Sequence, residues 1–259
     1  MAFINYVSKN IAAKIVYYGP GLSGKTTNLR FIYGNLDAQS RGDLICLETP
    51  TERTFFFDLL PVKAGLIEGY QIHFQLMTVP GQVFYDASRK SVIKGADGII
   101  FVADSQIPLL DSNLESFDGL RRNLQELEID LESTPLVFQY NKRDLDKLIP
   151  VDVFNSRLNP SGQPFIEAVA TSGNGVFDSL REIARLVVPN LKELLISGEK
   201  GKGRKTTDLG ESPVEYGREE HIELSESPEE APVRLRKIRF YSLRDVESEI
   251  EKLSEEFTK

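Results

Sequence analysis

The sequence contains little cysteine and no long hydrophobic run, and each absence excludes a class of protein. Its 259 residues include one cysteine and no tryptophan. The single cysteine, Cys46, excludes an internal disulfide and favours a reducing cytoplasm, and we interpret it as a small buried apolar residue. No apolar stretch approaches the roughly 20 residues that a membrane-spanning helix needs. We therefore expect a cytoplasmic protein with no integral membrane segment.

Signals for export, lipid attachment and nucleic-acid binding are also missing. The first residues, MAFINYVSKN, lack the basic start and apolar stretch of a signal peptide. Alanine at position 2 excludes glycine-dependent myristoylation, and the last residues, EEFTK, contain no prenylation box. A net charge of −8 argues against nucleic acid as the main partner. We expect no nucleic-acid partner.

Residues 1–196 alternate short β-branched runs with longer amphipathic patterns. These patterns predict strands at 13–18, 70–79, 97–105, 134–141 and 165–170, and helices at 25–36, 112–127 and 175–196. Such alternation favours right-handed crossovers and an α/β fold, in which helices cover both faces of a mostly parallel central sheet. In such folds, ligands bind beyond the carboxyl ends of the strands.

The composition changes after Ile196. We predict a flexible charged linker at 197–231, because it joins the basic, glycine-rich GEKGKGRK to an acidic tract that has few apolar side chains. Residues 232–259 then form a short basic segment and an apolar seam, which predicts a short amphipathic helix at the end of a mostly disordered extension. The seam consists of Leu243, Val246, Ile250, Leu253 and Phe257. Such a helix either docks on a partner or on its own domain, or is marginal and mostly solvated, and the sequence leaves both open.

A phosphate-binding loop is predicted between the strand at 13–18 and the helix that follows. The stretch GPGLSGKT matches G-x-x-x-x-G-K-[ST], whose backbone N–H groups surround phosphate oxygens while the lysine neutralises them. The hydroxyl of Thr26 is the expected Mg²⁺ ligand, and the start of the helix presents its positive end to the anion. The predicted phosphate-site residues are Gly19, Gly21, Leu22, Ser23, Gly24, Lys25, Thr26 and Thr27.

A second motif indicates which nucleotide binds. Asn141, Lys142 and Asp144 form N-K-x-D directly after a predicted strand. A carboxylate at Asp144 can accept two hydrogen bonds from guanine, whereas adenine offers no such pair of donors. Backbone N–H groups near Ala170 and Thr171 are weaker candidates for contact with the guanine oxygen. These residues predict binding of GTP and GDP.

Two further stretches supply candidates for hydrolysis. In LMTVPGQVFYD, Gly81 can present its N–H to a γ-phosphate and Gln82 can orient the attacking water, as the glutamine of Ras-type proteins does. Upstream, Thr54 is a candidate second hydroxyl ligand for Mg²⁺. Arg53 beside it is a candidate for stabilising transition-state charge, although an exposed arginine is more often simply solvated.

With these motifs in this order, the chain resembles a small Ras-like P-loop GTPase, and residues 1–196 resemble the MglA family of bacterial gliding-motility GTPases. The likeness rests on FINY, KIVYYGPGLSGKTTNLR, RTFFFD, TVPGQVFYDASRK, GADGIIFVADSQ and QYNKRDL. Threonine at position 78 stands where Ras proteins usually carry an aspartate, as in the MglA group. We expect weaker Mg²⁺ retention than in a Ras protein, with Asp58 compensating in part.

The resemblance implies a switch that is active with GTP, hydrolyses GTP slowly and controls cell polarity and gliding or pilus-based motility. It implies an activating partner of the roadblock fold, similar to MglB, that contributes no arginine and repositions Arg53 and Gln82 instead. It also implies motility or polarity effectors, and concentration at a cell pole through partners; we expect a monomer when free. The alternative function is a nucleotide-gated scaffold with little hydrolysis that recruits effectors through its C-terminal helix.

Overall fold

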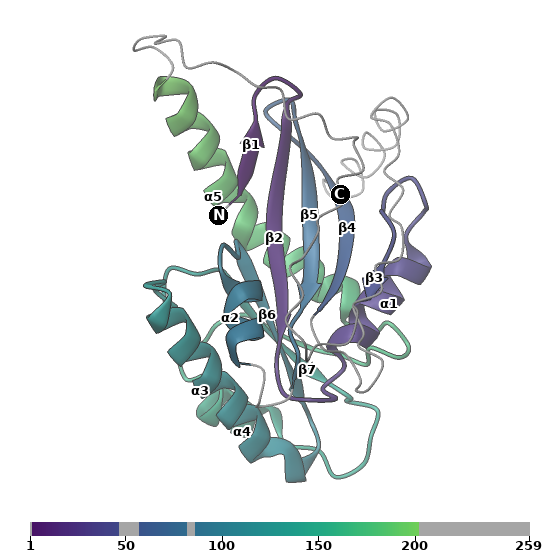
Figure 1. Ribbon diagram of the computed structural model, residues 1–259. Helices are drawn as coiled ribbons and strands as arrows, with labels where there is room; N and C mark the ends of the chain where they lie inside the picture. The colour runs from purple at the N-terminus through teal and green to yellow at the C-terminus, as the bar shows by residue number, and fades with distance from the viewer. Residues whose placement is uncertain (1, 47–56, 82–85, 202–259) are drawn as a thin grey trace, which may run out of the picture.

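The computed structural model describes residues 2–46, 57–81 and 86–201 (Figure 1). The described strands form one mixed sheet in the order β3-β4-β5-β2-β6-β7-β8, with β1 paired to β2. The strands are β1 (Phe3–Asn5), β2 (Asn10–Tyr18), β3 (Ile45–Cys46), β4 (Asp58–Ile67), β5 (Tyr70–Thr78), β6 (Gly98–Asp104), β7 (Leu136–Asn141) and β8 (Phe165–Glu167). The helices are α1 (Lys25–Asn35), α2 (Asp86–Ile93), the 3-10 helix η1 (Ile107–Leu109), α3 (Leu110–Glu126), α4 (Val151–Arg157) and α5 (Val176–Gly201).

The centre of the sheet is parallel and one edge is antiparallel. β5, β2, β6, β7 and β8 pair in parallel, so their carboxyl ends meet at one edge of the sheet. β4 turns back on β5 through a tight hairpin and pairs with it antiparallel, and β3 pairs antiparallel with β4. β1 pairs with residues 10–12 of β2, the half of that strand that lies before its pairing with β6 at residues 15–18. The long central strand β2 thus has neighbours along its whole length.

Alternation along the buried strands distributes side chains to two cores, because successive residues of a strand point to opposite faces. In β2, Ile15 and Tyr17 face the core that α1 and α5 cover, whereas Val16 and Tyr18 face the core on the other side. That second core is closed by α2, α3 and α4. In Figure 1, α5 runs behind the sheet and α3 lies in front of it. Both faces of the sheet are therefore covered.

The structure confirms the predicted mostly parallel sheet with helices on both faces. Each predicted strand and helix overlaps an observed element, with end points that differ by up to three residues at most boundaries and by more at the end of α5. That helix runs to Gly201, beyond Ile196, where we placed the end of the domain. Strands β1, β3 and β4, the 3-10 helix η1 and helices α2 and α4 were not among the elements predicted from these patterns. The predicted linker beyond Gly201 and the C-terminal helix lie outside the described residues.

Within the described ranges, no helix is both long and apolar enough to cross a membrane.

Candidate nucleotide-binding site

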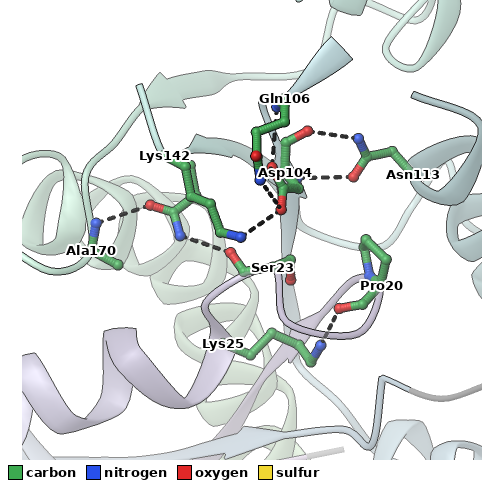
Figure 2. A network of polar contacts seen from close by, with 9 residues as sticks. Pro20, Ser23, Lys25, Asp104, Gln106, Asn113, Lys142 and Ala170 are labelled. Carbon is green, nitrogen blue, oxygen red and sulfur yellow. Dashed lines mark hydrogen bonds and ion pairs between the residues drawn. The ribbon is translucent and has the colours of Figure 1, made fainter. Parts of the chain in front are cut away.

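The predicted phosphate loop joins the end of β2 to the start of α1. Lys25, the first residue of α1, is buried, and its ammonium turns back across the loop (Figure 2). Its Nζ donates hydrogen bonds to the carbonyl oxygens of Gly19, at 2.9 Å, and Pro20, at 2.6 Å. The loop therefore curls around the lysine ammonium, which places one cation inside the predicted phosphate loop.

The environment of Lys25 disfavours an uncompensated positive charge. Burial lowers the pKa of Lys25 to about 7, the Asp58 carboxylate raises it in part, and the nearby Arg89 guanidinium lowers it further. A buried ammonium loses its hydration, so the neutral form gains relative to the charged one. An anion placed beside this lysine would restore the charged form, which is what a phosphate site requires.

Two glycines allow the loops of this site to approach one another closely. Gly24 has φ 105°, and a Cβ there would lie 2.2 Å from the Asn141 side-chain nitrogen. Gly81, which follows β5, lies against the phosphate loop, because a Cβ there would be 2.6 Å from the backbone nitrogen of Gly21 and 2.9 Å from Lys25 Nζ. Side chains at either position would push the loops apart.

Asn141, the last residue of β7, links three segments of the site. Its Nδ2 donates to the Ser23 carbonyl oxygen at 2.7 Å, and its Oδ1 accepts from the Ala170 N–H at 2.9 Å. Asn141 is buried, so both bonds are shielded from water. The asparagine of N-K-x-D therefore ties the phosphate loop to the loop that carries Ala170 and Thr171.

Lys142 is held by an ion pair with Asp104, the last residue of β6. Its Nζ lies 2.6 Å from Asp104 Oδ2, and the Asp104 side chain is 2% exposed. Asn113 of α3 holds the Asp104 backbone, accepting from its N–H at 2.9 Å and donating to its carbonyl at 2.8 Å. The Gln106 side chain also donates to the same carboxylate (Figure 2). Lys142 is therefore oriented by groups from β6 and α3.

A carboxylate lies beside the predicted Mg²⁺ ligand Thr26. The Thr26 hydroxyl donates to Asp58 Oδ2 at 2.6 Å, and the Thr78 hydroxyl donates to the same oxygen at 2.9 Å. The Asp58 N–H in turn donates to Thr78 Oγ1 at 2.9 Å. Antiparallel pairing of β4 with β5 brings Asp58 to the end of the sheet where Thr78 stands. A carboxylate from the neighbouring strand thus lies beside both Thr26 and Thr78.

No protein-family model matches this chain. Over 193 residues, which are 74% of the chain, it is 54% identical to the Mutual gliding-motility protein MglA of Myxococcus xanthus (strain DK1622), and it covers 99% of that protein. The chain belongs to the MglA family. It is also 25% identical to mouse Ras-related protein Rab-40B and 26% identical to the human protein, in each case over 125 residues and 43% of that relative. These partial matches, which span 48% of the chain, agree with its Ras-like fold.

Most of the predicted site residues of this MglA-family chain meet at the carboxyl edge of its sheet. Leu22 has φ 61° and is 86% exposed, so it occupies a left-handed position in the phosphate loop without being glycine. Asp144 and Thr171 are exposed in the loops after β7 and β8, and Thr27 is partly buried on α1. Arg53, Thr54 and Gln82 lie outside the described residues.

Two residues near the site, Asp104 and Gln139, were not among the predicted site residues. Asp104 ends the buried run GIIFVAD, and an acidic residue at the carboxyl end of a buried strand is a signal that points to it. Gln139 lies inside the buried run LVFQYN and contacts Asn28 and Ser179. A polar residue within an otherwise apolar strand is a signal too, but it does not name its partners.

Proposed function

We propose that this chain is a molecular switch that binds GTP and GDP with Mg²⁺ and slowly hydrolyses GTP. The observation that carries the proposal is the position of Asn141, whose side chain joins the phosphate loop at Ser23 to the loop at Ala170. This bridge brings the phosphate motif and the purine motif to one edge of the sheet, as a single nucleotide requires. The buried Lys25 supports binding of an anion there.

Selectivity for guanine is assigned to Asp144. Its carboxylate would accept from the ring and exocyclic N–H groups of guanine, and would remain unpaired with adenine. Lys142, fixed by its 2.6 Å pair with Asp104, would lie along the base. The N–H groups of Ala170 and Thr171 would lie near the guanine oxygen.

The residues around Thr26 fit a magnesium ion. Mg²⁺ prefers oxygen ligands and keeps several waters, so one or two protein oxygens are enough. Thr26 and Thr54 would ligate the ion directly. The Asp58 carboxylate, 2.6 Å from the Thr26 hydroxyl, would help to retain the ion, a role that an aspartate at position 78 would otherwise have. The ion would neutralise charge on the phosphates. The hydrogen bond from Thr26 to Asp58 would fix the position of the Thr26 hydroxyl oxygen for this role.

Hydrolysis is assigned to Gln82, which would orient the water, and to Arg53, which would stabilise transition-state charge. Gly81, packed against the phosphate loop, would present its N–H to the γ-phosphate. We propose that turnover is slow until an activating partner of the roadblock fold, similar to MglB, positions Gln82 and Arg53. In this proposal the free protein is a cytoplasmic monomer that partners concentrate at a cell pole, where it controls polarity and gliding or pilus-based motility through effectors.

Nucleotide binding is tested with fluorescent GDP and ADP in the presence of Mg²⁺. We expect the purified chain to bind GDP, and Asp144→Asn to lose most of that affinity while the variant remains folded. Preference for ADP, or no binding of either nucleotide, would contradict the proposal.

Hydrolysis is tested by measuring GTP turnover with and without a purified roadblock-fold partner. We expect strong acceleration by the partner, and its loss in Arg53→Ala and Gln82→Ala. Binding of GTP without accelerated turnover would favour the scaffold function instead.

A further inference from the structure

Three polar side chains lie fully buried beneath the candidate nucleotide site. Asn28 of α1, Gln139 of β7 and Ser179 of α5 each have 0% exposure. They lie on the face of the sheet that α1 and α5 cover, close to apolar side chains such as Val137 and Ile183. A buried polar group is costly unless it is hydrogen-bonded, so this cluster depends on its internal contacts.

The three side chains form one continuous set of hydrogen bonds with Gln139 at its centre. The Gln139 and Asn28 amides pair reciprocally, Asn28 Nδ2 donating to Gln139 Oε1 at 2.8 Å and Gln139 Nε2 donating to Asn28 Oδ1 at 2.9 Å. Gln139 Nε2 also lies 2.9 Å from Ser179 Oγ, to which it donates. We call Asn28, Gln139 and Ser179 the buried triad.

Both ends of the buried triad terminate on glycine carbonyls in equivalent positions. Asn28 Nδ2 donates to the Gly24 carbonyl at 2.9 Å, and Ser179 Oγ donates to the Gly175 carbonyl at 2.7 Å. Each carbonyl also accepts the backbone N–H of the same residue, four positions along the helix, at 3.0 Å. Gly24 directly precedes α1, and Gly175 directly precedes α5.

These two glycines end the two loops that the proposed nucleotide would touch. Gly24 closes the phosphate loop and has φ 105°, and Gly175 closes the loop that begins at Ala170 and has φ 73°. Asn141 links the same loops through Ser23 and Ala170. Because Gln139 stands two residues before Asn141 on β7, its side chain reaches the same face one step deeper in the core.

We propose that Gln139 is a positioning residue for nucleotide binding, acting through Asn28 and Ser179 to hold the phosphate loop and the purine loop at a fixed separation. It would touch no part of the nucleotide. The inference rests on the proposed GTP site, because it assigns the buried triad a role in how tightly one ligand is held at both ends. A shape-matched apolar cluster would fill the core equally well but would not tie the two glycine carbonyls together.

The test measures release of a fluorescent GDP with Mg²⁺ from the full-length chain and from Gln139→Met. We expect release at least about tenfold faster in the variant, because a small loss of loop alignment lowers affinity steeply. The control is Asn10→Ala, which removes a partly buried asparagine at the start of β2 whose side chain contacts Ser8 and His73, at the opposite end of that strand from the phosphate loop. Compared at a similar loss of melting temperature, the control should release GDP within about twofold of the parent rate, because its side chain contacts neither of the two site loops.

A double-mutant cycle separates positioning from general destabilisation. Asn28→Leu and Ser179→Ala act through the same Gln139 side chain, so their effects on the GDP release rate should be non-additive. Additive effects, or a Gln139→Met release rate equal to that of the parent chain, would overturn the inference.

If Gln139→Met does not fold, two other variants replace it. The triple variant Asn28→Leu, Gln139→Met, Ser179→Ala leaves no polar group of the triad unpaired, and the single variant Ser179→Ala is the mildest change. Faster GDP release in these variants supports the inference, and release at the parent rate overturns it. A parent chain that fails to bind GDP contradicts the proposed function, whereas a parent that binds GDP with unaltered triad variants contradicts this inference alone.

Discussion

The Asp58 carboxylate lies 2.6 Å from the hydroxyl of Thr26, although the two residues belong to different elements and are 32 positions apart. Asp58 opens β4 and Thr26 lies in the first turn of α1. The carboxylate is 1% exposed and also accepts from Thr78. A buried carboxylate from β4 thus lies beside the proposed metal ligand, while Thr78 at the end of β5 offers only a hydroxyl.

Removing that charge should weaken Mg²⁺ retention. In Asp58→Asn the amide oxygen still accepts hydrogen bonds, but the attraction between carboxylate and cation is gone. We expect the Mg²⁺ concentration needed to slow GDP release to rise about tenfold, equivalent to about 1.4 kcal/mol. Titration of Mg²⁺ against the GDP release rate measures it. Asp152→Asn, an exposed aspartate on α4, is the control; equal magnesium dependence in both variants would refute the role of Asp58.

The lowered pKa of Lys25 should make the nucleotide-free protein more stable as the pH rises. Folding moves this pKa from its ordinary 10.5 to about 7, so between these values the unfolded chain binds more protons than the folded one. The free energy of unfolding therefore increases with pH in that window, by at most about 1.4 kcal/mol per pH unit for one proton. Lys25→Met removes this contribution. The variant should therefore be more stable than the parent chain at pH 7, and this difference in free energy of unfolding should shrink as the pH rises. Urea denaturation of both proteins at pH 7, 8 and 9 measures the difference, and a value that does not change with pH would contradict the prediction.

Two glycine-to-alanine changes near the same helix should have opposite effects. At Gly24, φ is 105° and a Cβ would lie 2.2 Å from Asn141 Nδ2, so alanine must displace the bridge to Ser23. We expect Gly24→Ala to lower the free energy of unfolding by about 2 kcal/mol or more. At Gly34, near the end of α1, no atom of the described residues lies within 4 Å of an added Cβ apart from its chain neighbours and the helix backbone, so Gly34→Ala should stabilise the chain by roughly 0.5–1 kcal/mol. Urea denaturation measures both, and equal signs would be inconsistent with the geometry.

The ion pair between Lys142 and Asp104 should matter for nucleotide retention. Because the Asp104 side chain is 2% exposed and the pair is 2.6 Å long, Asp104→Asn leaves the lysine without its fixed partner. We expect GDP release to accelerate about tenfold, in line with losing one charged partner of a buried pair. The matched change is Asp178→Asn, which breaks an exposed pair with Arg181 on α5 and should leave release unaltered. If both variants release GDP at the parent rate, Asp104 does not orient the lysine for binding.

Local sequence was enough to predict the phosphate loop and the long strands, whose conformation depends mainly on residues that are close together in the chain. Glycines and a lysine at fixed spacing between a strand and a helix predicted the loop around Lys25, because the conformation of that loop depends on neighbours in the chain. The β-branched runs predicted β2, β5, β6 and β7. β6 and β7 are buried along their whole length and need mostly apolar residues, whereas β5 is buried at alternate positions. Short elements such as α4 carry too few residues for a periodic signal to stand out.

The sequence alone therefore determined the class of fold, the phosphate loop and the motif that ends β7. The tertiary structure decided which residues from other elements meet these motifs. Asp58 reaches Thr26 only because β4 runs antiparallel to β5, and Gln139 reaches Asn28 and Ser179 only because α1 and α5 pack side by side on one face of the sheet. The physical reason is that a hydrogen bond between residues far apart in the chain depends on strand order and on helix packing, and neither is encoded in the residues that surround each partner.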